Sequence, residues 1–233
     1  MDPTISIKPL LAVLVSAAAV PLIARSKSPD ARELWTFAAA FAKLSLVLSM
    51  LPAVLAGGRP ALTLVELLPG VSLAFRVDAM GLLFALVSSS LWIVTSAYSI
   101  GYMRGLDEHA QTRYFCFFTL ALSATLGVAL SANLLTLYLF YEMLSFATYP
   151  LVTHHQDEEA RRSGRKYLVY IVGGSVGLVL PAMITCYLAS GTLEFAARGF
   201  LDGRIGDSAA LVLVLLFVFG LAKAAVMPLH AWL

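Results

Sequence analysis

Residues 133–153, NLLTLYLFYEMLSFATYPLVT, decide the fold, because they form an apolar stretch long enough to cross a lipid bilayer. Glu142 stands in the middle of this stretch. A second apolar stretch, ALVLVLLFVFGLAKAAVMPLHAWL at residues 210–233, is interrupted in the same way by Lys223. The two stretches predict membrane-spanning helices, and they raise the question of what a carboxylate and an amine do inside them.

The composition of the chain supports a membrane protein. Hydrophobic residues make up 60% of the sequence and charged residues only 13%, whereas an ordinary soluble domain has about 25% charged residues. Seven apolar runs of bilayer length can be distinguished, at roughly residues 5–24, 33–56, 79–103, 113–131, 133–153, 167–189 and 209–230. We therefore predict an all-α, polytopic membrane protein with about seven transmembrane helices in a lipid bilayer. The net charge of +2 is too small to indicate a nucleic-acid partner.

Cofactor and metal sites are not indicated by the sequence. Cys116 and Cys186 both lie in apolar runs, without the spacing of a disulfide framework or a metal site. The chain also has no glycine-rich loop for a nucleotide or flavin and no cysteine set for an iron–sulfur cluster. We therefore expect no cofactor, no metal, and no redox or hydrolytic chemistry on this chain.

The basic residues between the apolar runs predict the orientation. Nine follow the first, third and fifth runs: Arg25, Lys27, Arg32, Arg104, Arg113, Arg161, Arg162, Arg165 and Lys166. Five lie on the opposite side: Lys8, Arg59, Arg76, Arg198 and Arg204. Since basic loops stay on the cytoplasmic side, this bias places the N-terminus outside. The first positive cluster follows the first apolar run, whereas in a signal peptide it would precede it, so we expect the first span to be retained.

Glu142 lies on a polar face of its predicted helix. Tyr138, Ser145 and Tyr149 stand at positions i−4, i+3 and i+7 from it, on the same face. A charged residue at mid-membrane costs about 2.5–3.5 kcal/mol on insertion scales, and such residues usually mark ion or proton paths. Hydroxyl groups both donate and accept, so they can relay protons to a carboxyl group. The alternative is a buried glutamate held by a lysine for helix packing alone.

Lys223 is predicted to share a helix with His230 at i+7. A Glu–Lys pair that separates and rejoins would change how tightly the lysine holds its proton, as a pump requires. His230 is expected at the cytoplasmic end of this helix, where it either exchanges protons with the cytoplasm or is a surface residue. Lys43 is either at the lipid edge or in the interior. His109, His154 and His155 are expected to be solvated.

Five segments resemble one known family, in the right order along the chain. They are FRVDAMGLLF at 75–84, YSIGYMRG at 98–105, LFYEMLSFATYPLV at 139–152, KYLVYIVGGS at 166–175 and GLAKAAVMPLHAWL at 220–233. This pattern is similar to the antiporter-like membrane subunits of respiratory complex I (its L, M and N types), membrane-bound hydrogenases and Mrp-type cation/proton antiporters. The resemblance covers residues from about 70 to 233.

The resemblance implies a fold and a set of site residues. The family has fourteen helices with two inverted five-helix repeats, each containing a broken helix. Glu142 matches the glutamate of the fifth helix, Lys223 the lysine of the seventh, and His230 lies in the same pattern. Residues 1–78 would then be two N-terminal helices and an external connection. Residues 79–233 would be a proton-translocating domain that ends before the eighth helix.

The resemblance also implies partners and a location. We expect a subunit of a multi-subunit complex in the inner membrane of a bacterial or archaeal cell. The complex would be a NADH–quinone oxidoreductase type, driven by a redox arm that carries flavin and iron–sulfur clusters, or an antiporter that exchanges protons for sodium.

Two alternatives to proton translocation remain open at this stage. The chain could be a structural membrane subunit without transport. It could also be a seven-helix retinal-binding protein with a Schiff base on Lys223. The retinal class needs a carboxylate in the third span, where this sequence has only Asp78 at the outer edge.

Overall fold

The computed structural model describes residues 4–196 and 199–232, so Arg198 and Leu233 lie outside the described residues. The helices in chain order are α1 (Lys8–Arg25), α2 (Pro29–Leu48), α3 (Leu51–Leu55), α4 (Ala79–Gly105), α5 (Gln111–Ala129), α6 (Leu134–Val152), α7 (Glu158–Gly174), the π-helix η1 (Ser175–Val179), α8 (Leu180–Ser190), α9 (Asp207–Gly220) and the 3-10 helix η2 (Ala222–Ala224). The strands are β1 (Thr4–Ile5), β2 (Pro60–Leu68) and β3 (Val71–Arg76).

Long helical segments dominate the structure, and they correspond to the seven predicted spans. The segments are α1, α2 with α3, α4, α5, α6, the continuous run α7–η1–α8, and α9. Five of them are long and apolar enough to cross a membrane on their own. Of the other two, α6 carries Glu142 and three tyrosines, and α9 has only 14 residues. The predicted all-helical, polytopic membrane class is confirmed.

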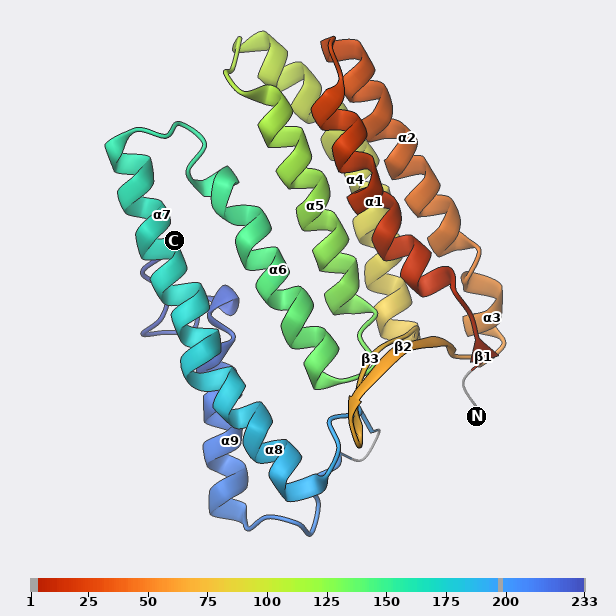
Figure 1. Cartoon of the computed structure of the whole chain (residues 1–233), viewed down its shortest axis with the longest axis vertical. Helices are drawn as coiled ribbons and strands as arrows, with labels where there is room; N and C mark the ends of the chain where they lie inside the picture. The colour runs from red at the N-terminus through yellow and green to blue at the C-terminus, as the bar shows by residue number, and fades with distance from the viewer. Residues whose placement is uncertain (1–3, 197–198, 233) are drawn as a thin grey trace.

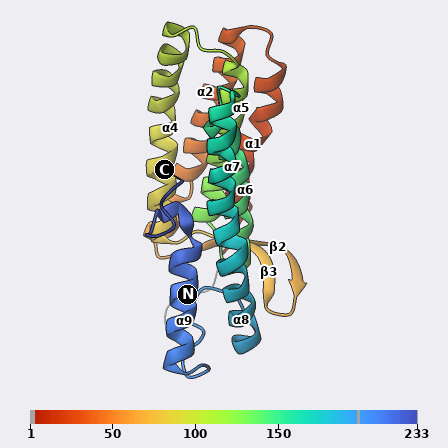
Figure 2. The same cartoon turned by 90° about the vertical axis from the view of Figure 1, so that its left-hand side faces the viewer.

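The connections between the helices alternate between two ends of the molecule (Figures 1 and 2). The α1–α2, α4–α5 and α6–α7 connections lie at one end, and the β2–β3 hairpin and the α8–α9 connection lie at the other. The predicted external connection is partly a sheet of order β1-β2-β3, in which β1 is parallel and β3 antiparallel to β2. We call the two ends the loop end and the hairpin end.

Side-chain caps start several of the helices. Asp78 accepts a hydrogen bond from the Gly81 amide at 2.7 Å and starts α4, and Asn133 accepts one from the Thr136 amide at 2.9 Å and starts α6. Such caps satisfy backbone donors that a helix leaves unpaired at its N-terminus. The cap of α6 comes only four residues after the end of α5, which produces the tight helical hairpin that carries Glu142.

The main core joins the N-terminal helices to α4 and α5. Its fully or almost fully buried members include Val13, Val47, Phe75, Leu82 and Leu126. Lys43 lies in the same bundle and is fully buried.

The environment of Lys43 is interior, which decides between the two predicted positions. Its Nζ donates a hydrogen bond to the Leu122 carbonyl at 2.9 Å and lies 4.9 Å from the centre of the Trp92 ring. A backbone carbonyl and an aromatic face therefore replace water around this ammonium group.

The last predicted span is correct only as far as Gly220. Beyond it the backbone leaves the helix at Leu221, forms the short η2 turn with Lys223 in it, and takes a left-handed conformation at Ala225. Glycine is a weak helix former, and Pro228 lacks the amide that a continuing helix would need. The prediction of one helix over 209–230 was therefore wrong for residues 221–230.

Candidate functional site

Lys223 contacts α6 through its side-chain amine and its backbone amide. Its Nζ donates hydrogen bonds to the Ser145 hydroxyl and to the Tyr141 carbonyl, the latter at 3.4 Å, and it lies 4.0 Å from the centre of the Tyr141 ring. The Lys223 amide also donates to the Tyr141 hydroxyl at 3.3 Å. Because the last helix ends at Gly220, Lys223 lies against the middle of α6, beside the predicted polar face.

Glu142 is next to this contact but is not part of it. Both carboxylate oxygens are buried, and neither has a hydrogen-bond partner among the described residues. Within the same part of the chain, no lysine, arginine or histidine nitrogen comes within 4.0 Å of the Glu142 carboxylate. Glu142 therefore follows Tyr141, a contact residue of Lys223, along α6, and the described residues show no direct ion pair between Glu142 and Lys223.

Burying an ionised carboxyl group without a hydrogen-bond or ion-pair partner costs free energy. An ionised group in this position must be paired or hydrated, or else it takes up a proton and becomes neutral. Glu142 is therefore a buried carboxyl group without a hydrogen-bond partner among the described residues, rather than one half of an ion pair.

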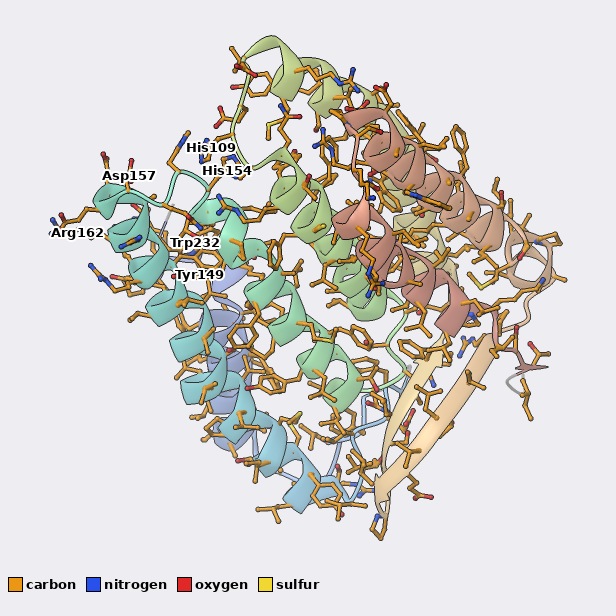
Figure 3. All side chains as sticks on the ribbon, turned by 45° about the horizontal axis from the view of Figure 1, so that its top comes forward. His109, Tyr149, His154, Asp157, Arg162 and Trp232 are labelled. Atoms are coloured by element: carbon orange, nitrogen blue, oxygen red, sulfur yellow. The ribbon has the colours of Figure 1, made fainter. Side chains whose placement is uncertain are left out.

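The structure places the other predicted site residues in different surroundings. Tyr138 is buried against η1 and α8, and Ser145 is fully buried beneath Lys223. Tyr149 packs in a cluster with Tyr167 and Trp232, which Figure 3 shows near it. His230 is exposed in a turn instead of lying on a helix in line with Lys223.

Tyr141 is a site residue that the sequence reasoning missed. It contributes its ring, its carbonyl and its hydroxyl to the Lys223 contact. It stands at i−4 from Ser145, so the helical spacing of α6 already placed the two on one face. The missing information was the position of Lys223, which depends on where the last helix breaks.

A cavity of about 470 Å³ reaches Lys223 from the hairpin end. Its walls include Lys223 and Tyr141 at the inner end and Asp78 and Ser131, which adjoin β3 and the α5–α6 turn, at the outer end. Thr125 lines it in between. Open space therefore extends from the hairpin end to the lysine.

Hydroxyl groups continue from Lys223 toward the loop end. Thr148 lies one turn beyond Ser145 on α6 and shares a 2.6 Å hydrogen bond with the Tyr167 hydroxyl of α7. Tyr167 in turn contacts Trp232 edge to face, and the Trp232 indole donates to the Ala222 carbonyl at 3.0 Å, directly before Lys223. Lys223 thus lies between the cavity on one side and the hydrogen bond between the Thr148 and Tyr167 hydroxyls on the other.

Comparison with known proteins shows which family this chain resembles. Residues 131–233 match the family described as NADH:quinone oxidoreductase/Mrp antiporter, transmembrane region. The predicted resemblance to antiporter-like membrane subunits is confirmed. The matched segment contains Glu142, Tyr141, Ser145 and Lys223, so all of the contacts around the lysine lie within the region that the antiporter-like family shares.

Individual antiporter-like relatives span different complexes. Hydrogenase-4 component B of Escherichia coli (strain K12) is 32% identical over 161 residues, which cover 69% of this chain and 24% of that protein. The Na(+)/H(+) antiporter subunit A1 of Staphylococcus aureus (strain bovine RF122 / ET3-1) is 29% identical over 169 residues, which cover 70% of this chain and 20% of that protein. The chain therefore spans about a quarter of the length of these relatives.

Solved structures show that the fold is shared. A subunit of an archaeal membrane-bound sulfane sulfur reductase superimposes with a TM-score of 0.83 at 20% identity, over 97% of this chain and 47% of that one. A subunit of respiratory complex I from Thermus thermophilus gives a TM-score of 0.76 at 22% identity, over 97% of this chain and 46% of that one. At these identities the likeness establishes the fold alone.

Proposed function

We propose that the chain is a proton-translocating membrane subunit of a complex I-like NADH–quinone oxidoreductase or of an Mrp-type cation/proton antiporter. The observation that carries the proposal is the placement of Lys223 between the cavity and the hydrogen-bonded hydroxyls of Thr148 and Tyr167. The same helix, α6, carries the buried Glu142 carboxyl group, which has no partner among the described residues. Intramembrane ionisable groups that face a cavity are typical of proton relays.

In this proposal Lys223 and Glu142 exchange protons with opposite sides of the membrane. Lys223 lines the cavity that extends from the hairpin end, and water that enters this cavity would reach the residue. Ser145 and Tyr141 hold the ammonium form through hydrogen bonds and the aromatic face. A small movement of the Lys223 turn toward Glu142 would form the Glu–Lys pair and change the proton affinity of both groups.

The location and partners follow from the family. The chain would be embedded in the inner membrane of a bacterial or archaeal cell with its N-terminus outside, among other membrane subunits. Protons would be moved by coupling to a redox arm with flavin and iron–sulfur clusters, or by exchange for sodium. The comparisons favour this family over the retinal-binding alternative.

Transport by the complete complex in proteoliposomes tests the proposal. Glu142→Gln and Lys223→Met each remove a proton-binding group at nearly constant size, and we expect each to lower proton uptake by about 100-fold or more. Matched controls are Glu159→Gln and Lys166→Met, which alter exposed residues of α7. A pH-sensitive dye inside the vesicles reports proton uptake, driven by a reductant or by a sodium gradient.

The same experiment distinguishes transport from a structural role. Native gels and subunit composition show whether the variant complexes assemble. Assembled complexes with lost uptake support the proposal. Normal uptake in both Glu142→Gln and Lys223→Met would overturn it, and failed assembly with normal uptake per intact complex would favour a structural subunit.

A further inference from the structure

Four side chains of metal-ligand type come together at the loop end. Glu108 and His109 lie in the α4–α5 connection, and His154 and His155 lie in the α6–α7 connection. Figure 3 shows His109 and His154 next to each other, and their ring centres are 4.7 Å apart. Solvation was predicted for all three histidines, but the His154 side chain is only 15% exposed, so for this residue the prediction was wrong.

The distances within this group suit a small metal ion. The Glu108 Oε1 atom lies 2.7 Å from His109 Nδ1, 3.6 Å from His154 Nε2 and 4.0 Å from His155 Nδ1. One ligand atom each from Glu108, His109 and His154 can be chosen so that all lie within 4.8 Å of one another. In a tetrahedral zinc site with bonds of about 2.0–2.1 Å, neighbouring ligand atoms are roughly 3.4 Å apart. Of the observed separations, 2.7 Å is shorter than this value, and 3.6 Å and 4.0 Å are longer.

The two inner histidines are oriented by backbone carbonyls. His109 Nε2 is 3.1 Å from the His154 carbonyl, and His154 Nε2 is 3.1 Å from the His109 carbonyl. Metal-binding histidines usually donate one ring N–H to a carbonyl or carboxylate and bind the ion with the other nitrogen. For His109 this pattern leaves Nδ1, which lies 2.7 Å from Glu108, for the ion. For His154 the nitrogen near Glu108 is Nε2, so binding of the ion there would replace its contact with the His109 carbonyl. The buried Nδ1 of His154 has no hydrogen-bond partner among the described residues.

We propose that Glu108, His109 and His154 bind a divalent zinc-class ion at the loop end, with His155 as the fourth ligand. Imidazole and carboxylate ligands suit this class of ion. His155 is exposed, and its Nδ1 is 4.0 Å from Glu108 Oε1, so a change of side-chain rotamer brings it to the ion. The ion would fasten the α4–α5 connection to the end of α6, the helix that carries Glu142. This inference does not depend on the proposed transport function.

Zinc binding to the complete complex tests the proposal. The purified complex is stripped with a chelator and titrated with Zn²⁺, and bound zinc is measured by elemental analysis and calorimetry. We expect the double variant His109→Ala/His154→Ala to weaken zinc binding by about 100-fold. Glu108→Gln changes no side-chain size and should weaken it by about 10-fold. His230→Ala, which removes an exposed histidine elsewhere, should bind as the parent does.

X-ray absorption of the zinc-loaded complex gives an independent readout. Imidazole ligands at about 2.0–2.1 Å in the parent, lost in the double variant, would support the site. A parent complex that binds no zinc at micromolar concentration would overturn it. Unchanged zinc binding in both Glu108→Gln and the double variant would overturn it as well, whatever the transport activity of these variants.

Discussion

At the scale of single residues, the contact between Lys223 and Ser145 explains how a cation is accommodated in an apolar region. The Lys223 ammonium group finds a hydroxyl, a carbonyl and an aromatic ring, all from α6, in place of water. Each of these groups stabilises the positive charge without neutralising it. Under the proposed function, the lysine would keep its proton here and release it when its surroundings change.

Removing the Ser145 hydroxyl should weaken the stabilisation of the Lys223 ammonium group. In Ser145→Ala, the Lys223 Nζ atom keeps the Tyr141 ring and carbonyl but loses the Ser145 hydroxyl, which accepts its hydrogen bond. A hydrogen bond to a charged group contributes about 1.5–3 kcal/mol, so we expect proton uptake by the complex to fall by about 10-fold. Proteoliposome uptake measures this, with Ser163→Ala, an exposed serine of α7, as the control. Equal uptake in the two variants would show that Ser145 has no part in proton transfer.

The sequence predicted the charged residues of the site better than their contacts. Glu142 and Lys223 were evident because a charge in an apolar run is costly and therefore rarely incidental. Tyr141 was missed because a tyrosine in a membrane helix is unremarkable by itself. His230 was assigned to the helix of Lys223 by counting turns, and that reasoning failed because the helix ends at Gly220.

At the scale of secondary-structure elements, the break after Gly220 depends on a close approach to the π-helix η1. A Cβ added to Gly220 would lie 2.6 Å from Val179 Cγ2 and 2.9 Å from the Val179 backbone nitrogen. Single π-turns in long helices are frequent at functional sites. Here η1 provides the surface against which α9 ends and the Lys223 turn begins.

The glycines of α7 and η1 show what sequence patterns could not decide. Gly173 and Gly177 form a G-x-x-x-G pattern typical of close helix packing. An added Cβ at either position would meet no atom of the described residues within 4 Å. The close approach instead involves Gly174, whose added Cβ would lie 3.3 Å from the Ala222 Cβ. Within the described residues, the close approach therefore uses a neighbouring face of the same segment.

Gly220→Ala should therefore disturb both packing and the site. The added methyl group has no free space against Val179, so α9 or η1 must shift, at a cost of about 1–3 kcal/mol. Because Lys223 follows three residues later, the shift should also lower proton uptake. Thermal unfolding of the purified complex measures the first effect.

Gly173→Ala is the matched control for this substitution. Its methyl group meets open space within the described chain, and alanine favours a helix over glycine by about 1 kcal/mol. We expect its melting temperature to be unchanged or higher. A melting temperature for Gly220→Ala as high as that of Gly173→Ala would contradict the role assigned to the η1 contact.

At the scale of the whole molecule, the number of spans was predictable because lipid demands long apolar segments. The positions of the breaks were not, since they arise from contacts between helices, as at Gly220. The β2–β3 hairpin was also not evident from the apolar runs, because its strands lie outside them. What the sequence did predict at this scale is the division of the connections between two ends.

That division leads to a prediction of orientation. Basic residues are concentrated at the loop end, and the preference of such residues for the cytoplasm places the hairpin end outside the cell. A single cysteine at Glu66 of β2 should therefore react with a membrane-impermeant maleimide on intact cells, and one at Arg162 of α7 should react only after permeabilisation. Both positions are exposed, and Figure 3 shows Arg162 at the loop end.

The measurement needs a background without the two native cysteines, so Cys116 and Cys186 are first replaced by alanine and assembly of the complex is checked. Labelling of both introduced cysteines is then compared in intact cells and in inverted vesicles, where the two results should exchange. If Arg162→Cys were labelled on intact cells and Glu66→Cys were protected, the N-terminus would lie inside. In that case the cavity that reaches Lys223 from the hairpin end would open toward the cytoplasm, and the direction of proton entry in the proposed mechanism would have to be reversed.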